Sequence, residues 1–84
     1  MPTQFTLADL QQILINRIGV DEEDIPDDPD TTFDSIGLDS LAVMELQLEV
    51  EQRYGFRISQ EDAEKLRSFR EAVDYVNGQL AELG

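Results

Sequence analysis

Apolar residues recur at intervals of three and four along the first stretch of the chain, which predicts an amphipathic helix. This helix should begin at Thr6 and run to about Ile18, because Thr6 and Asp9 have the spacing of a capping box. Gly19 follows as a natural left-handed stop. The positions that share its apolar face are Leu7, Leu10, Ile13, Leu14 and Ile18.

The helical pattern breaks between residues 20 and 38. Pro26, Pro29 and a run of acidic residues rule out a long regular element in this stretch. A loop of this length is usually functional or anchored when the domain is so small. We expect the apolar side chains of Ile25, Phe33 and Ile36 to anchor it on the core.

Two helices are predicted after this loop. The first of them spans residues 40–54 and ends at Gly55, which suits the left-handed position at a helix end. A short helix then fits residues 60–66, with Ser59 as its N-cap.

A last helix completes the predicted fold. Ser68 and Glu71 have capping-box spacing at its start. No segment alternates between apolar and polar residues over a useful length, so no strand is predicted. The sequence therefore predicts an all-α fold, a four-helix bundle of three longer helices and one short helix with a long loop between helices 1 and 2. The buried stripe of the last helix should consist of Phe69, Ala72, Val73, Val76 and Leu80.

The helix over residues 40–54 has apolar residues on two faces. Its core face should consist of Val43, Leu46, Val50 and Tyr54. The opposite face holds Leu41, Met44 and Leu48, with Glu45, Glu49 and Glu51 beside them. One possibility is that these apolar residues pack beneath the loop or the short helix. The other is an exposed apolar strip with an acidic border, which suits a basic, partly apolar partner.

Composition narrows the choice of partners and compartment. The chain of 84 residues has 19 acidic and 6 basic residues, a formal charge of −13 and no cysteine. Nucleic acid and anionic membranes are disfavoured because phosphates need a basic surface, and no apolar run is long enough to span a bilayer. Without a secretory signal pattern, we expect a cytoplasmic, monomeric domain.

Ser40 is the residue most suggestive of chemistry, since a turn at Gly37 delivers it to the first turn of a helix. Asp39 or Ser40 suits the helix N-cap. A hydrolytic serine needs a base, usually histidine, and the chain has none. Leu38 and Ala42 replace the glycines of a nucleophile elbow. Ser40 is therefore expected to be a cap or an attachment point, and no catalytic residue is predicted.

The acidic loop does not fit a calcium site. An EF-hand loop needs an oxygen ligand at its fifth position and a glycine at its sixth. Counted from Asp21, those positions hold Ile25 and Pro26, and counted from Asp28 the glycine position holds Phe33. No metal site is predicted, and the acids of the loop are read as a solvated surface.

These residues resemble the acyl carrier protein family. The resemblance rests on Asp39-Ser40-Leu41 after Gly37, on the acidic helix through Arg53-Tyr54-Gly55, and on residues 72–78. It covers nearly the whole chain and implies one acyl carrier domain over residues 1–84, with no catalytic activity of its own. It also implies that a phosphopantetheinyl transferase attaches phosphopantetheine to Ser40, where acyl groups are then held as thioesters.

The resemblance implies two further sets of functional residues. The docking face for basic partner enzymes would consist of Asp39, Leu41, Met44, Glu45, Leu48, Glu49 and Glu51. The space between helices that can shelter a short acyl chain would be lined by Ile36, Leu46, Val50 and Val73.

Residues 33–40 are most similar to the same stretch of stand-alone aromatic polyketide carriers. That similarity implies polyketide biosynthesis, with a malonyl-loading acyltransferase, a ketosynthase and tailoring enzymes as partners. A fatty acid carrier and an aminoacyl or peptidyl carrier remain alternatives. A different class of protein, an unmodified acidic helical interaction domain in which Ser40 only caps a helix, is also open.

Overall fold

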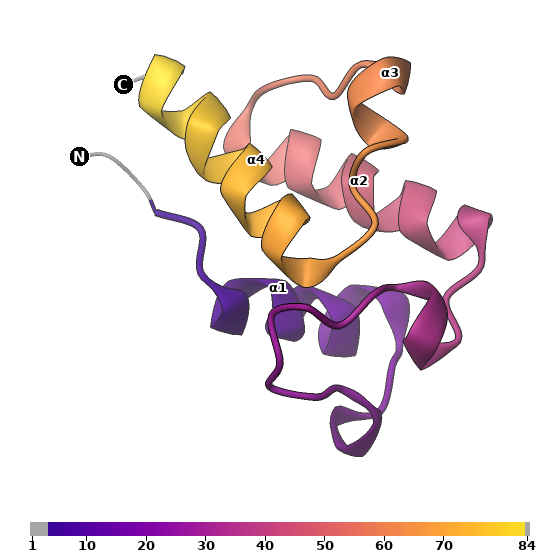
Figure 1. The fold of residues 1–84 in the computed structure, drawn as a ribbon. Coiled ribbons are helices and arrows are strands. Elements are labelled where there is room, and N and C mark those ends of the chain that lie inside the picture. The colour runs from indigo at the N-terminus through magenta and orange to yellow at the C-terminus, as the bar shows by residue number, and fades with distance from the viewer. Residues whose placement is uncertain (1–3, 84) are drawn as a thin grey trace.

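The computed structural model describes residues 4–83. The α-helices in this part of the chain are α1 (Leu7–Ile13), α2 (Ser40–Tyr54), α3 (Gln60–Ala63) and α4 (Phe69–Leu83) (Figure 1). Short 3₁₀ turns at Glu22–Asp24 and Asp34–Ile36 lie in the long loop. In place of any strand, residues 4–83 contain one isolated β-bridge, between Thr32 and Ser68. The predicted all-α fold of three longer helices and one short helix is therefore confirmed.

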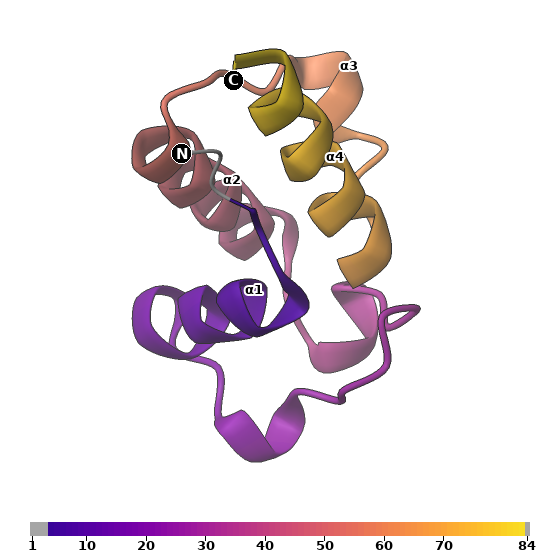
Figure 2. The ribbon, with the colours of Figure 1, turned by 90° about the vertical axis from the view of Figure 1, so that its left-hand side faces the viewer.

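The arrangement is clearest when the two views are compared. α1, α2 and α4 enclose the core, and the long loop runs along one end of the molecule beside α1 (Figures 1 and 2). α3 lies at the opposite end, where the Tyr75 hydroxyl of α4 donates a hydrogen bond of 2.9 Å to the Asp62 carboxylate.

α1 begins with the predicted capping box. The Thr6 hydroxyl accepts from the Asp9 amide at 3.1 Å, and the Asp9 carboxylate accepts from the Thr6 amide at 3.0 Å. The chain remains helical to Ile18, but Leu14–Ile18 form a wider π-helical turn. The left-handed Gly19, with φ of 89°, ends this turn as predicted, and its amide donates to the Leu14 carbonyl.

The long loop is fixed to the rest of the molecule by its backbone as well as by its side chains. Phe33 is buried, and Ile25 and Ile36 are half-buried against the core, as predicted. In addition, the Phe33 amide donates to the Arg67 carbonyl at 3.0 Å, and the Phe69 amide donates to the Thr31 carbonyl at 2.9 Å. The end of the loop is therefore joined to the start of α4.

α3 is shorter than predicted: it ends at Ala63 and not at residue 66. After Ala63 the chain tightens, with the Leu66 amide donating to the Ala63 carbonyl at 3.2 Å. The tighter turn lets Leu66 enter the core while the next carbonyl, of Arg67, pairs with Phe33. Ser59 is the N-cap as predicted, and its hydroxyl accepts from the Asp62 amide at 3.1 Å.

α4 closes the core and also holds the N-terminal segment. Ser68 accepts from the Glu71 amide at 3.2 Å, and Phe69 is completely buried against Phe33, with ring centroids 5.5 Å apart. The Asn77 carboxamide makes two hydrogen bonds of 2.8 Å to the backbone of Phe5. Of the predicted stripe, three residues are buried and two are half-buried: Phe69, Ala72 and Val76, then Val73 and Leu80.

Candidate attachment site and groove on the second helix

A short turn fixes the position of Ser40. The turn Asp34–Ile36 ends at Gly37, whose φ of 84° is left-handed, and Leu38 then enters the core with 8% of its surface exposed. Two residues later Ser40 is the first residue of α2, and its side chain is exposed. The buried leucine thus holds the turn in place while the serine faces outward.

Asp39, and not Ser40, caps α2. The Asp39 carboxylate accepts a hydrogen bond of 2.8 Å from the Ala42 amide. The sequence left both residues open as the cap, and the structure assigns this role to Asp39. The Ser40 hydroxyl is therefore not used to begin the helix.

Ser40 lines an open groove that is bordered by α2 and α3. Its volume is about 690 Å³. The loop before α2 contributes Phe33 and Leu38 to its lining, α2 contributes Val43 and Gln47, and further residues come from α3 and the turn after it. The exposed Ser40 side chain therefore borders an open space on the protein surface.

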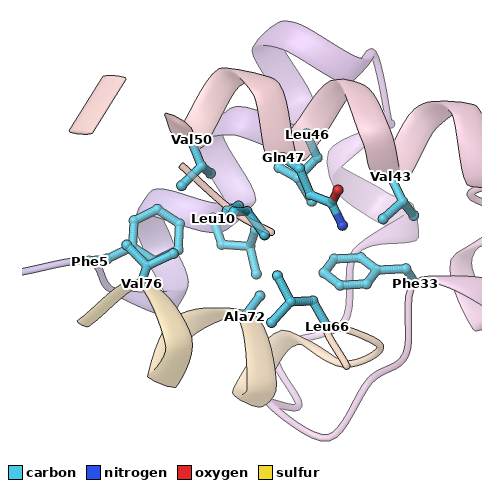
Figure 3. A pocket seen from close by; sticks show the side chains of 11 residues that line it. Phe5, Leu10, Phe33, Val43, Leu46, Gln47, Val50, Leu66, Ala72 and Val76 are labelled. Atoms are coloured by element: carbon cyan, nitrogen blue, oxygen red, sulfur yellow. The ribbon is translucent and has the colours of Figure 1, made fainter. Parts of the chain in front are cut away.

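A small apolar cavity lies deeper between the helices (Figure 3). It has a volume of about 20 Å³, close to the space that one water molecule needs. Leu46 and Val50 line it, whereas Ile36 and Val73 are half-buried against the core outside its lining. Residues outside α2 line the cavity as well, and the sequence did not indicate that they do so. They include Phe5, Phe33, Leu66 and Val76.

The exposed apolar strip on α2 is present. Leu41, Met44 and Leu48 are 62%, 54% and 50% exposed, and they are the exposed large apolar side chains in the part of the chain that the structure describes. Asp39 and Glu45 beside them are exposed too. The possibility that this strip packs beneath the loop or α3 is thereby excluded.

Two of the predicted acidic border residues have partners within the chain. The Glu49 carboxylate lies 3.0 Å from the Arg17 guanidinium and 3.1 Å from that of Arg53, and its side chain is only 17% exposed. Glu51 is half-buried and accepts from the Ile58 amide at 3.3 Å. The exposed carboxylates beside the strip are therefore those of Glu45 and of Asp39, which also caps α2.

Two further features are absent within residues 4–83. The side chains there form no cluster of three or more His, Cys, Asp or Glu that could hold a metal ion. None of the described helices is long and apolar enough to cross a membrane.

Residues 8–76 match the family model described as a phosphopantetheine attachment site. The chain is 42% identical over 78 residues to the monensin polyketide synthase acyl carrier protein of Streptomyces virginiae, covering 92% of this chain and 89% of that protein. It is 39% identical over 77 residues to an acyl carrier protein of Rubrobacter xylanophilus, covering 90% and 93% of the two chains.

The fold has solved relatives as well. The solution structure of the 3-oxo-butyl acyl carrier protein of the actinorhodin polyketide synthase from Streptomyces coelicolor matches with a TM-score of 0.83 and 40% identity, over 100% of both chains. An acyl carrier protein of Thermotoga maritima matches with a TM-score of 0.84 and 28% identity, over 93% of this chain and 89% of that one. With its phosphopantetheine attachment domain, the chain belongs to the acyl carrier protein family.

Proposed function

We propose that Ser40 is the residue to which phosphopantetheine is attached. The observation that carries this proposal is the exposed Ser40 side chain in the lining of a groove of about 690 Å³, next to a helix cap that Asp39 already provides. Phosphopantetheine supplies a terminal thiol that holds acyl groups as thioesters.

The surroundings of Ser40 fit such a group. Free amides and the dipole at the start of α2 favour the negative charge of a phosphodiester. Arg67 adds a cation to the lining of the same groove. The apolar side chains of Leu38, Val43 and Met44 offer contact to the less polar remainder of the arm.

We further propose that the chain is a single carrier domain, residues 1–84, without catalysis of its own, and that it serves polyketide biosynthesis in the cytoplasm as a monomer. Its similarity to the monensin and actinorhodin carriers supports the pathway, and the lack of histidine and cysteine supports a purely carrying role. The proposed partners are a phosphopantetheinyl transferase, a malonyl-loading acyltransferase, a ketosynthase and tailoring enzymes. A fatty acid or an aminoacyl carrier is the alternative within the family.

The proposed docking face for these enzymes is the exposed strip of α2. Leu41, Met44 and Leu48 provide its apolar area, and Asp39 and Glu45 provide its exposed negative charge. Glu49 and Glu51 lie at its edge. Their carboxylates already have partners within the chain, so they contribute less to the attraction of a basic enzyme.

Intact mass measurement tests the attachment. The purified protein, incubated with coenzyme A and a promiscuous phosphopantetheinyl transferase, should gain the mass of one phosphopantetheine. Ser40→Ala should gain nothing, whereas Ser35→Ala, which removes an exposed serine of the preceding turn, should still gain it. A folded wild-type protein that gains no mass would contradict the proposal and favour an unmodified interaction domain.

A further inference from the structure

A second open groove lies at the C-terminal end of α2. Its volume is about 530 Å³, and we call it the distal groove. Its lining consists of Leu48, Glu51, Gln52, Gly55, Phe56 and Arg57. Leu48 is also the last residue of the exposed apolar strip, and Gln52 is exposed one turn further along the same face. The proposed docking face therefore continues into the distal groove.

A left-handed turn brings Arg57 to the surface beside this groove. Gly55 ends α2 with a φ of 78°, and its amide donates to the Glu51 carbonyl at 2.8 Å. Phe56 then enters the core, where it is 9% exposed and its ring centroid lies 6.3 Å from that of Tyr75. The residue after the buried Phe56 is Arg57, and its side chain is exposed.

Arg57 has no carboxylate partner among the described residues. Each ion pair within residues 4–83 involves Arg17, Arg53 or Arg70. Arg17 and Arg53 share one carboxylate, that of Glu49. Three of the 6 basic residues of the chain therefore lie around the end of α2. This end of the strip is relatively positive, whereas the exposed carboxylates lie beside its other end.

We propose that the distal groove binds an acidic segment of the partner enzyme. An apolar side chain of that segment packs on Leu48, and a carboxylate beside it pairs with Arg57. Basic side chains of the same enzyme face Glu45 at the same time. Glu45 and Gln52 are seven residues apart, about 10 Å at 1.5 Å per residue, so one interface of ordinary size, about 800 Å² per partner, covers both. The inference rests on the docking face proposed above.

Opposite charges at the two ends of the strip allow one docking orientation. A partner turned end for end would bring its basic side chains to Arg57 and its carboxylate to Glu45, and such pairs of like charge are unfavourable. In the favoured orientation the basic side chains lie beside Glu45, in the half of α2 that begins with the exposed Ser40. The active site of the partner is thereby directed to the attachment residue.

Charge reversal at Arg57 separates this inference from an effect of net charge. The carrier is modified and acyl-loaded, and kcat/KM is measured for acyl transfer to a purified ketosynthase. Arg57→Glu should lower kcat/KM about threefold to fivefold, as expected when an exposed charge pair becomes repulsive. A basic enzyme that senses only net charge would instead react faster with this more acidic variant. The melting temperature should stay close to that of wild type, since Arg57 is exposed.

Lys65→Glu is the matched control. It makes the same change in net charge at another exposed side chain, one that lines neither groove. Its kcat/KM should equal or exceed that of wild type. An Arg57→Glu variant that transfers its acyl group as fast as Lys65→Glu would overturn the inference.

A second readout does not require phosphopantetheine. ¹⁵N-labelled Ser40→Ala protein is titrated with the ketosynthase, and the amide signals of Gln52 and Arg57 should lose intensity together with that of Glu45. Loss at Glu45 alone would overturn the inference and leave the docking face in place. Failure of the proposed function is a distinct result, because the wild-type protein then gains no mass in the attachment experiment.

Discussion

Glu49 and Glu45 lie on one helix, yet they have different surroundings. Helical spacing was enough to predict that both border the apolar strip of α2. Only the structure reveals that Arg17, which precedes the long loop, reaches the Glu49 carboxylate at 3.0 Å. This contact depends on how the loop folds back, and no local pattern encodes that. The same holds for Gln47, whose place between groove and cavity depends on elements distant in sequence.

We expect Glu45→Lys to slow acyl transfer by a basic partner enzyme severalfold, because it reverses an exposed charge on the docking face. Its melting temperature should stay close to that of wild type. Added salt should slow the wild-type reaction as well. Transfer rates measured with a purified partner at low and high salt check this expectation, and rates that respond to neither change would mean that the docking face is elsewhere.

Glu49→Lys should differ from Glu45→Lys in stability. It removes two ion pairs and places a cation beside Arg17 and Arg53, which are 61% and 44% exposed at their side chains. Pairs this exposed contribute little, so we expect a loss of about 1 kcal/mol in the free energy of unfolding. Urea titrations of the two variants measure the difference, and equal stability would show that the pairs contribute nothing.

At the scale of elements, the helix boundaries followed from local signals. Capping side chains and left-handed glycines are encoded within a few residues, so the start of α1 and both ends of α2 were predictable. The end of α3 was not predictable from local signals, because it depends on contacts with distant segments. Leu66 is buried in the core, and the Arg67 carbonyl accepts a hydrogen bond from the Phe33 amide. The π-helical turn after α1 could not be predicted either, because the spacing of apolar residues there is that of an ordinary α-helix.

The hydrogen bond that joins α3 to α4 predicts a loss of stability in alkali. Burial, and then the hydrogen bond to Asp62 and nearby acidic charge, raise the pKa of Tyr75 from 10.0 to about 12. Between these values the unfolded chain loses the Tyr75 proton while the folded chain keeps it, so stability should fall as the pH rises through this window. Unfolding of the wild-type protein by urea at several alkaline pH values measures the slope.

Tyr75→Phe is the matched variant for this measurement. It has no phenol to ionise at this position, so its stability should fall less steeply over the same pH range. Tyr54 remains as a second phenol, whose pKa is raised mainly by burial, and it should leave some slope in the variant. An equal slope in both proteins would mean that Tyr75 does not titrate as inferred.

At the scale of the whole molecule, one core unites segments from both ends of the chain. Its members could largely be predicted, since the stripes of α1, α2 and α4 supplied residues such as Leu14, Leu46 and Val76. The groove and the cavity could not be predicted from the sequence, because each is formed where several separate segments meet. Periodicity specifies which face of a helix is buried, but it does not specify the spaces left between helices.

Val50→Ala tests the core directly. Val50 is 4% exposed and lines the small cavity, so its truncation should cost about 1–3 kcal/mol through lost burial and an enlarged void. Leu48→Ala on the same helix is the control, because Leu48 is 50% exposed and should cost far less. Urea unfolding of both variants gives the comparison, and a smaller loss at Val50 than at Leu48 would contradict the described packing.

The two hydrogen bonds between Asn77 and the backbone of Phe5 have a practical consequence for handling the protein. They hold the start of the described chain against α4, whose last turn lies on the left in Figure 1, whereas α2 starts on the right. Phe5 and the last turn of α4 therefore lie on the side of the described structure remote from the start of α2, where Ser40 is the first residue, so a fluorescent protein, a resin linker or a neighbouring module joined beyond them should not cover Ser40. Immobilised or fused forms should consequently be modified by the transferase as readily as the free domain.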